Sequence, residues 1–183
     1  MSKSALIIGS DGSEEMELVI TGDVLRRAGI DVTVAGLQDR EKIVCSRKFT
    51  ITVDALLKDI VDKEFDAVIL PGGQPGSNNL AQDARVGEIL KHHEKAGKVV
   101  AAICAAPLAF KAHDIASGGS ITSYPSVKEK LTGYDYVEDR VHVWKNVITS
   151  RGPGTAFDFA LKIVETLVDA KTANEVRAAM LLQ

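Results

Sequence analysis

The stretch "VVAAICAAPLAF" (residues 99–110) decides the fold, because a short apolar run passes directly into a segment that suits a helix. Residues 99–103 are all apolar, which is typical of a parallel strand buried on both faces of a sheet. Pro107 fits the first turn of a helix, where its missing N–H is not needed. The pattern therefore places Cys104 where a parallel strand ends and a helix opens.

The same alternation of apolar runs and helical patterns continues along the chain. Strands are predicted at 4–9, 31–36, 66–70, 99–103 and 147–150. Helices are predicted near 14–28, 54–62, 84–97, 104–112, 155–169 and 173–182. Residues 49–53 and 141–145 alternate between apolar and polar positions, which indicates small antiparallel additions. Because no long Pro/Gly-rich linker interrupts the pattern, we predict a single doubly wound α/β domain over residues 1–183, with a mostly parallel sheet and helices on both faces.

The composition narrows the classes of function. The 183 residues are 45% hydrophobic and 26% charged, an ordinary globular balance. With a net charge of -3, the chain has no basic field for nucleic acid or an anionic membrane, so we expect neither DNA nor membrane as a partner. The apolar run at 5–8 is too short for a signal peptide or a membrane span. Cys45 and Cys104 have no CxxC spacing, so we expect reduced cysteines, no metal and a cytoplasmic location.

The place of Cys104 predicts a reactive thiol. Ligands of doubly wound sheets bind beyond the carboxyl ends of the strands. A helix that begins directly after Cys104 would direct its unpaired N–H groups and the positive end of its dipole at the sulfur. Such surroundings lower a cysteine pKa from about 8.5 into the range of roughly 3.5–7.5. The alternative is a buried structural cysteine, and the strand-to-helix pattern alone favours neither.

Glu17 is the second candidate. Three apolar residues share one arc of the first predicted helix: Ile20, Val24 and Ala28. At about 100° per residue, Glu17 falls within this arc, whereas Glu15 points outward. A carboxyl group that faces the core has a raised pKa and donates a hydrogen bond when it is protonated. The alternative is that these are first-turn acids favoured by the helix dipole, which suits Glu15 better than Glu17.

Glycines follow the third predicted strand in "LPGGQPG" (70–76). Their N–H groups can form a nest for an oxyanion, although Gly-rich loops are also ordinary connections between strands and helices. The loop has neither GxGxxG nor GK[ST], which disfavours nucleotide binding. No histidine completes an obvious triad with Cys104, and His92, His93 and His142 are more typical of surface or partly buried histidines than of a catalytic base.

Several sequence blocks together resemble one family. They are "EEME" (14–17), "RRAGIDVTVAGL" (26–37), "CSR" (45–47), "LPGG" (70–73), "AAICAAP" (101–107) and "TSRGPGT" (149–155). In this order, over nearly the whole chain, they resemble the Parkinsonism-associated deglycase branch of the ThiJ/PfpI superfamily. The resemblance implies a flavodoxin-like fold, a homodimer and a reactive cysteine at a sharp strand-to-helix turn.

The resemblance also implies roles for single residues. Cys104 is implied to be the nucleophile and redox-sensing thiol, and Glu17 the carboxylic acid that hydrogen-bonds it. The implied substrate-binding or oxyanion-binding residues are Gly72, Gly73, Ala105, Tyr124, Arg47 and Arg151. Cys45 matches a less reactive family cysteine near the dimer interface, although a role as a buried core cysteine is the better explanation of Cys45. Tyr124 departs from the pattern, because many members have a histidine before the proline that follows it here.

Two functions agree with these residues. In the first, Cys104 attacks methylglyoxal or glyoxal, and the protein releases lactate or glycolate without glutathione, cofactor or metal. Glycated adducts are a related substrate class, and peptidase activity is not expected because the Cys-His pair of the protease-like branch is absent. In the second, the protein is a non-catalytic redox sensor or chaperone whose Cys104 is oxidised to sulfinate. A nuclear or mitochondrial location under stress is a further expectation.

Overall fold

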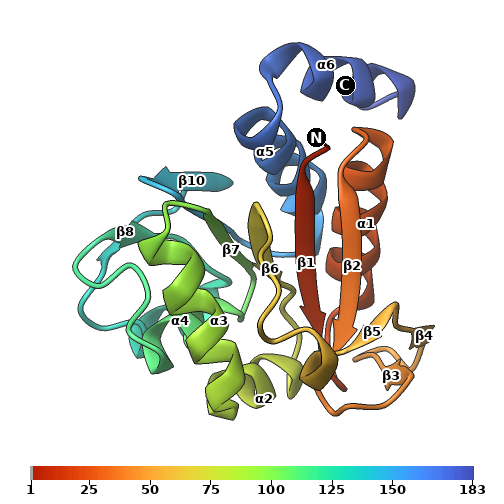
Figure 1. Ribbon diagram of the computed structural model, residues 1–183. Coiled ribbons are helices and arrows are strands. Elements are labelled where there is room, and N and C mark those ends of the chain that lie inside the picture. Colours follow the sequence, from red (N-terminus) through yellow and green to blue (C-terminus); the bar gives the residue numbers. More distant parts are fainter. Residues whose placement is uncertain (1) are drawn as a thin grey trace.

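A seven-stranded sheet runs through the part of the chain that the computed structural model describes, residues 2–183 (Figure 1). Its strands are β1 (Ser4–Gly9), β2 (Asp31–Gly36), β5 (Ala55–Leu56), β6 (Ala67–Leu70), β7 (Val99–Ile103), β10 (Val141–Trp144) and β11 (Val147–Ser150). They lie in the order β10-β11-β7-β6-β1-β2-β5, and all neighbours are parallel except β10 and β11. The central order β2-β1-β6-β7-β11 is that of flavodoxin-like sheets, which confirms the predicted fold class.

Helices cover both faces of this sheet (Figure 1). On one side, α5 (Ala156–Leu167) packs against both α1 (Glu15–Arg27) and α6 (Ala170–Ala179). On the other, α2 (Gly76–Gln82) packs against α3 (Ala84–Lys95) and α4 (Pro107–Ala112). The strands between them are fully buried over most of their length, so burial on both faces explains why they are near-continuous apolar runs.

Two small sheets complete the described structure. The alternating pattern at 49–53 becomes β4 (Thr50–Thr52), which pairs antiparallel with β3 (Lys42–Val44). The other pair, β8 (Ser120–Ile121) with β9 (Asp135–Tyr136), was not anticipated from the sequence. Short 3-10 turns occur at Leu57–Asp59, Pro125–Lys130 and Pro153–Thr155. None of the described helices is long and apolar enough to cross a membrane.

Several predicted helices need correction. The helix expected near 54–62 is instead β5 and a 3-10 turn, because the Asp54 carboxylate accepts the Val34 N–H at 2.9 Å and holds the chain beside β2. The last helix begins at Ala170 rather than near 173, since Asp169 caps it through the Thr172 N–H. The helix expected from residue 104 begins at Pro107, and α2 was not predicted.

The side of the sheet on which successive strands are added changes between β1 and β6. From β1 the chain passes to β2 on one side, and later strands fill the other side through β6, β7 and β11. The loops after β1, β6 and β7 therefore meet at the carboxyl edge of the sheet, where such folds bind ligands. These loops carry the residues singled out from the sequence.

Candidate active site

Cys104 lies at a sharp turn between β7 and α4. Its backbone has φ of 65°, a left-handed conformation that is uncommon for a residue with a side chain. Two hydrogen bonds hold it: the Cys104 N–H donates to Ser150 O at 3.0 Å, and the Tyr124 N–H donates to Cys104 O at 2.8 Å. A conformation of this kind costs about 1–3 kcal/mol and is typical of functional sites. The side chain is almost buried, with 9% of the residue exposed.

Glu17 reaches the same turn from the first turns of α1. The residue is completely buried, as its place on the helix predicted. Its Oε2 accepts the Gly72 N–H at 2.7 Å, and its carboxyl group is hydrogen-bonded to the Cys104 thiol. Burial raises the pKa of Glu17 from 4.5 to about 7, although the bonds from Gly72 and Cys104 oppose the rise. The group is therefore poised to exchange a proton near neutral pH.

The pKa of Cys104 is shifted in the direction opposite to the prediction. Burial, followed by the negative charge of Glu17, raises it to about 12, while N–H groups of Gly73 and Ala105 oppose the rise. The helix contributes little, because α4 has only six residues and begins three positions after Cys104. Protonation of Glu17 removes its charge, so the two groups titrate as a pair that carries one negative charge more readily than two.

The two glycines after β6 allow this close approach. A Cβ atom on Gly72 would lie 2.5 Å from Cys104 Cβ and 2.6 Å from Glu17 Oε2. Gly73 has φ of 86° and a hydrogen bond to the Cys104 thiol group. Gly73 and Ala105 thus provide the N–H groups at the sulfur, whereas the Gly72 N–H is occupied by Glu17. This differs from the expectation that Gly72 would help to bind an oxyanion.

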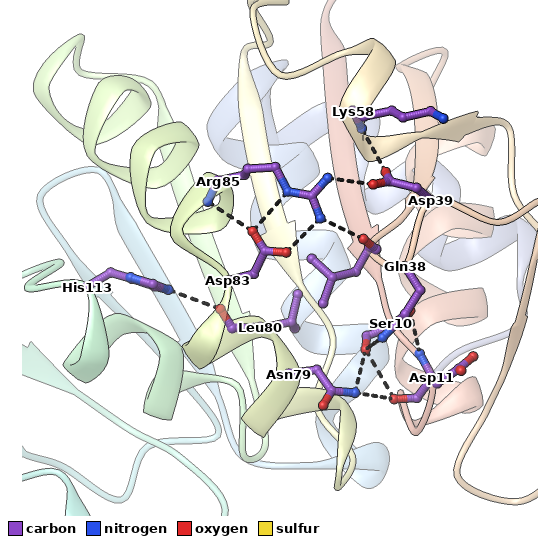
Figure 2. A network of polar contacts seen from close by, with 11 residues as sticks. Ser10, Asp11, Gln38, Asp39, Lys58, Asn79, Leu80, Asp83, Arg85 and His113 are labelled. Atoms are coloured by element: carbon purple, nitrogen blue, oxygen red, sulfur yellow. Dashed lines mark hydrogen bonds and ion pairs between the residues drawn. The ribbon is translucent and has the colours of Figure 1, made fainter.

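A polar network holds the β1–α1 loop, which leads into the helix that carries Glu17 (Figure 2). The Asn79 amide donates to Ser10 Oγ at 3.0 Å and to Asp11 O at 3.2 Å. The Gln38 amide donates to Ser10 Oγ at 2.8 Å and accepts the Asp11 N–H at 3.1 Å. This network fixes the loop that leads into α1, and thereby supports the placement of Glu17.

Arg85 extends the network toward α3. Its guanidinium bonds Asp83 and Asp39 at 2.7 and 2.8 Å, and Leu37 O at 2.9 Å (Figure 2). The pKa values of both carboxyl groups are lowered, and hydrogen bonds from the guanidinium contribute to each shift. Sequence reasoning missed this network because its members are scattered over four segments and form no motif.

Arg47 is exposed, and its backbone rather than its guanidinium binds α1. The Arg47 N–H donates to Glu15 Oε1 at 2.7 Å, and Ser46 Oγ donates to Glu15 Oε2 at 2.9 Å. Glu15 is therefore buried against the turn between β3 and β4, which corrects the prediction that it points outward. Nearby Cys45 is buried, and burial together with the charges of Glu15 and Glu14 raises its pKa to about 11. It has the properties of a core thiol.

Tyr124 and Arg151 lie beside the Cys104 turn. Tyr124 is 45% exposed, and its backbone N–H supports the turn, while its ring lies close to Gly152. Arg151 Nε donates to Ser123 O at 3.2 Å, so its guanidinium braces the neighbouring segment. The structure thus gathers Cys104, Glu17 and their glycine neighbours in direct contact, and keeps Arg47 outside this set of contacts. Within residues 2–183 no cluster of three His, Cys, Asp or Glu side chains has the geometry of a metal site.

Comparison with known proteins agrees with the fold. The model of the DJ-1/PfpI family matches residues 3–166. Protein dj-1beta of Drosophila melanogaster is 50% identical over 184 residues, covering 100% of this chain and 98% of the relative. Its crystal structure superposes with a TM-score of 0.98 and covers 100% of both chains. A Caenorhabditis elegans relative named glutathione-independent glyoxalase DJR-1.2 is 45% identical, covering 95% of this chain and 94% of the relative. Oxidized DJ-1 of Toxoplasma gondii is 34% identical, with a TM-score of 0.96 and 99% of both chains covered.

Proposed function

The chain belongs to the DJ-1/PfpI family, and we propose that it is a glutathione-independent glyoxalase that acts on small dicarbonyls through Cys104. The family includes a relative named as such an enzyme. The observation that carries the proposal is the carboxyl group of Glu17, held against the Cys104 thiol by the Gly72 N–H, with a pKa of about 7. A base of this pKa suits proton transfer at neutral pH.

The first step is addition of the thiol to the aldehyde of methylglyoxal. A bond forms between the Cys104 sulfur and the aldehyde carbon, and the thiol proton passes to the Glu17 carboxylate. Since Glu17 takes the proton during the attack, the raised pKa of the thiol does not prevent reaction. The N–H groups of Gly73 and Ala105, which surround the sulfur, lie next to the oxygen that gains charge.

The remaining steps need only Glu17 and water. Glu17 first gives the thiol proton to the oxygen of the adduct, which forms the hemithioacetal and restores the carboxylate. Glu17 then removes the proton from the carbon bonded to sulfur and returns it to the neighbouring carbon, which converts the hemithioacetal into a thioester through an enediol. Water then hydrolyses the thioester, which releases lactate and restores the thiol. One water is consumed, and no external oxidant or reductant is required. Tyr124 need not replace a histidine in this scheme, because Glu17 carries each proton.

Turnover of methylglyoxal to lactate without glutathione tests the proposal. We expect activity in the wild type, none in Cys104→Ser, and a loss of about 100-fold or more in Glu17→Gln. Cys45→Ser is the matched control, because Cys45 lies outside the contacts of Glu17, and its activity should stay close to wild type. Absence of lactate with folded, reduced wild-type protein would contradict the proposal. The same assay with glycated amino acids tests adducts as a second substrate class.

We also propose that the protein forms a homodimer. Met16 and Val19 on α1 are exposed, as are Val44 and Phe49, which flank the turn that binds Glu15. Phe49 is 68% exposed. An apolar cluster of this kind on a protein surface marks an interface. Light scattering should give the mass of a dimer for the wild type, and Phe49→Asp should shift the protein to monomer. Leu181→Asp, at another exposed apolar residue, is the control and should remain a dimer. A monomeric wild type would refute this assembly.

A second candidate function is redox sensing at the same thiol. Within the described residues, Glu17 Oε1 is buried and has no hydrogen-bond partner. A protonated Glu17 can therefore donate to an oxygen added to the Cys104 sulfur, which would stabilise a sulfinate. Peroxide treatment followed by mass spectrometry should add two oxygens at Cys104 in the wild type and fewer in Glu17→Ala. Such a role suits a protein with two free cysteines in a reducing compartment such as the cytoplasm.

A further inference from the structure

A second group of side chains with the geometry of a nucleophilic site lies along the edge of the sheet. Ser120 Oγ is 2.6 Å from His142 Nε2, and His142 Nδ1 is 3.0 Å from Asp139 Oδ2. Asp139 accepts the proton of Nδ1, which leaves Nε2 to accept the proton of the Ser120 hydroxyl. A serine, a base and a carboxylate that orients the base are thus hydrogen-bonded in series, the arrangement that activates a serine nucleophile.

The edge strand β10 creates this arrangement. His142 and Trp144 lie two positions apart on β10, so their side chains point to the same face. On that face His142 meets Ser120, and the Trp144 ring covers Gly119, where a Cβ atom would lie 2.6 Å from the ring. Gly119 therefore has no room for a side chain, and its close packing under Trp144 brings Ser120 to the histidine.

The chain just before Ser120 is open to solvent. Ser120 is half-buried, and a Cβ on the nearby Gly118 would meet nothing within 4 Å. The His142 side chain is only 18% exposed, so its bond to Ser120 is partly protected from water. The Trp144 ring covers Gly119, the residue directly before the serine, and the Lys145 ammonium lies 4.2 Å from the centre of that ring. An apolar ring at this position suits a small apolar acyl group.

We propose that Ser120 is a second nucleophile, which hydrolyses short-chain carboxylic esters with His142 as its base. Ser120 Oγ bonds to the acyl carbon while its proton passes to His142 Nε2. The bond to the alcohol oxygen breaks, and that oxygen takes the proton from His142. Water then attacks the acyl-serine, giving up a proton to His142, and the acid leaves as the proton returns to Ser120. This activity is independent of Cys104 and of the proposed glyoxalase reaction.

Covalent labelling of Ser120 tests the proposal directly. A fluorophosphonate reacts with an activated serine by forming an O–P bond and releasing fluoride, and peptide mapping identifies the labelled residue. We expect labelling at Ser120 in the wild type, and about 100-fold slower labelling in His142→Gln. Asp139→Asn should slow labelling by about fivefold, because an exposed charge pair contributes up to about 1 kcal/mol. Hydrolysis of p-nitrophenyl acetate by the Cys104→Ser protein should fall in the same order.

Matched controls separate this chemistry from general reactivity. Ser117 is an exposed serine of the same segment whose hydroxyl donates to Asp114 O, and Ser117→Ala should leave labelling unchanged. His92 pairs with Glu64 and, among residues 2–183, with no serine, so His92→Gln should also have no effect. Ser120 is not an activated nucleophile if the folded wild type carries no label at Ser120 under excess probe. The same conclusion follows if His142→Gln and Asp139→Asn are labelled as fast as the wild type.

Discussion

The buried carboxyl group of Glu17 makes the stability of the protein depend on pH in a defined window. Below pH 4.5 this carboxyl is protonated in the folded and unfolded chains alike. Between pH 4.5 and about 7 the unfolded chain ionises Glu17 while the folded protein retains the proton, so rising pH favours unfolding. Above about pH 7 the folded protein bears the full penalty of a buried charge.

The structure sets the size of this effect. A rise in the pKa from 4.5 to about 7 corresponds to about 3 kcal/mol of stability lost across the window. Because Glu17 is completely buried, solvent does not reduce the penalty. In Glu17→Gln the amide oxygen accepts the Gly72 N–H in the same way, but no charge develops. Relative to this variant, the wild type should therefore lose about 3 kcal/mol of unfolding free energy between pH 4 and pH 8.

Urea denaturation of both proteins at half-unit pH steps, with a thiol reductant present, measures this difference. Acids with lowered pKa values, such as Asp66 and Asp158, contribute equally to both proteins and cancel in the comparison. The variant should become progressively more stable than the wild type as the pH rises through the window. A difference that stays constant from pH 4 to pH 8 would show that Glu17 has an ordinary pKa, and it would remove the basis for its role as a base.

Three further predictions concern the same site. Glu17→Gln should lower the pKa of the Cys104 thiol, because the charge that disfavours the thiolate is gone; the pH dependence of iodoacetamide labelling, mapped to Cys104 by mass spectrometry, tests this. Gly72→Ala should lose dicarbonyl turnover and about 1–3 kcal/mol of stability, since the new methyl group would overlap Cys104, whereas Gly154→Ala, which meets nothing within 4 Å, should change neither property. Asn79→Ala should lower the unfolding free energy by about 1 kcal/mol and reduce dicarbonyl turnover, because the β1–α1 loop loses two hydrogen bonds. Asn78→Ala, at an exposed position, is the control in urea denaturation and in the turnover assay.

The sequence predicted those parts of the structure that depend on one periodic signal. The five main parallel strands follow near-continuous apolar runs, and the burial of Glu17 follows from its place on a single helix. The helix α2 escaped prediction because "GSNNLAQ" contains residues with low helix propensity. Tertiary packing forms this helix: a Cβ on Gly76 would lie 2.6 Å from Ser13 N, so the start of α2 packs tightly against the β1–α1 loop.

Contacts between distant segments explain the remaining differences. Glu15 is buried by a turn that lies more than thirty positions further along the chain, which no helical pattern reveals. Likewise, Ser120 lies on β8 and His142 on β10, two strands of different sheets that pack together without pairing, so neither residue stands out in the sequence. The raised pKa of Cys104 comes first from burial and then from the charge of Glu17, and a local strand-to-helix pattern carries no information about either.

The energetics of Glu17 favour a chemical role over a structural one. At neutral pH an uncharged side chain of the same shape would accept the Gly72 N–H without the penalty of a buried charge. Burial of a carboxyl here therefore lowers stability in the range where the protein is folded and active, and the hydrogen bond alone does not require it. A carboxyl group can give up and take back a proton beside the thiol, whereas a glutamine amide cannot. The residue is explained by the chemistry of Cys104, and the pH-dependent stability is its thermodynamic consequence.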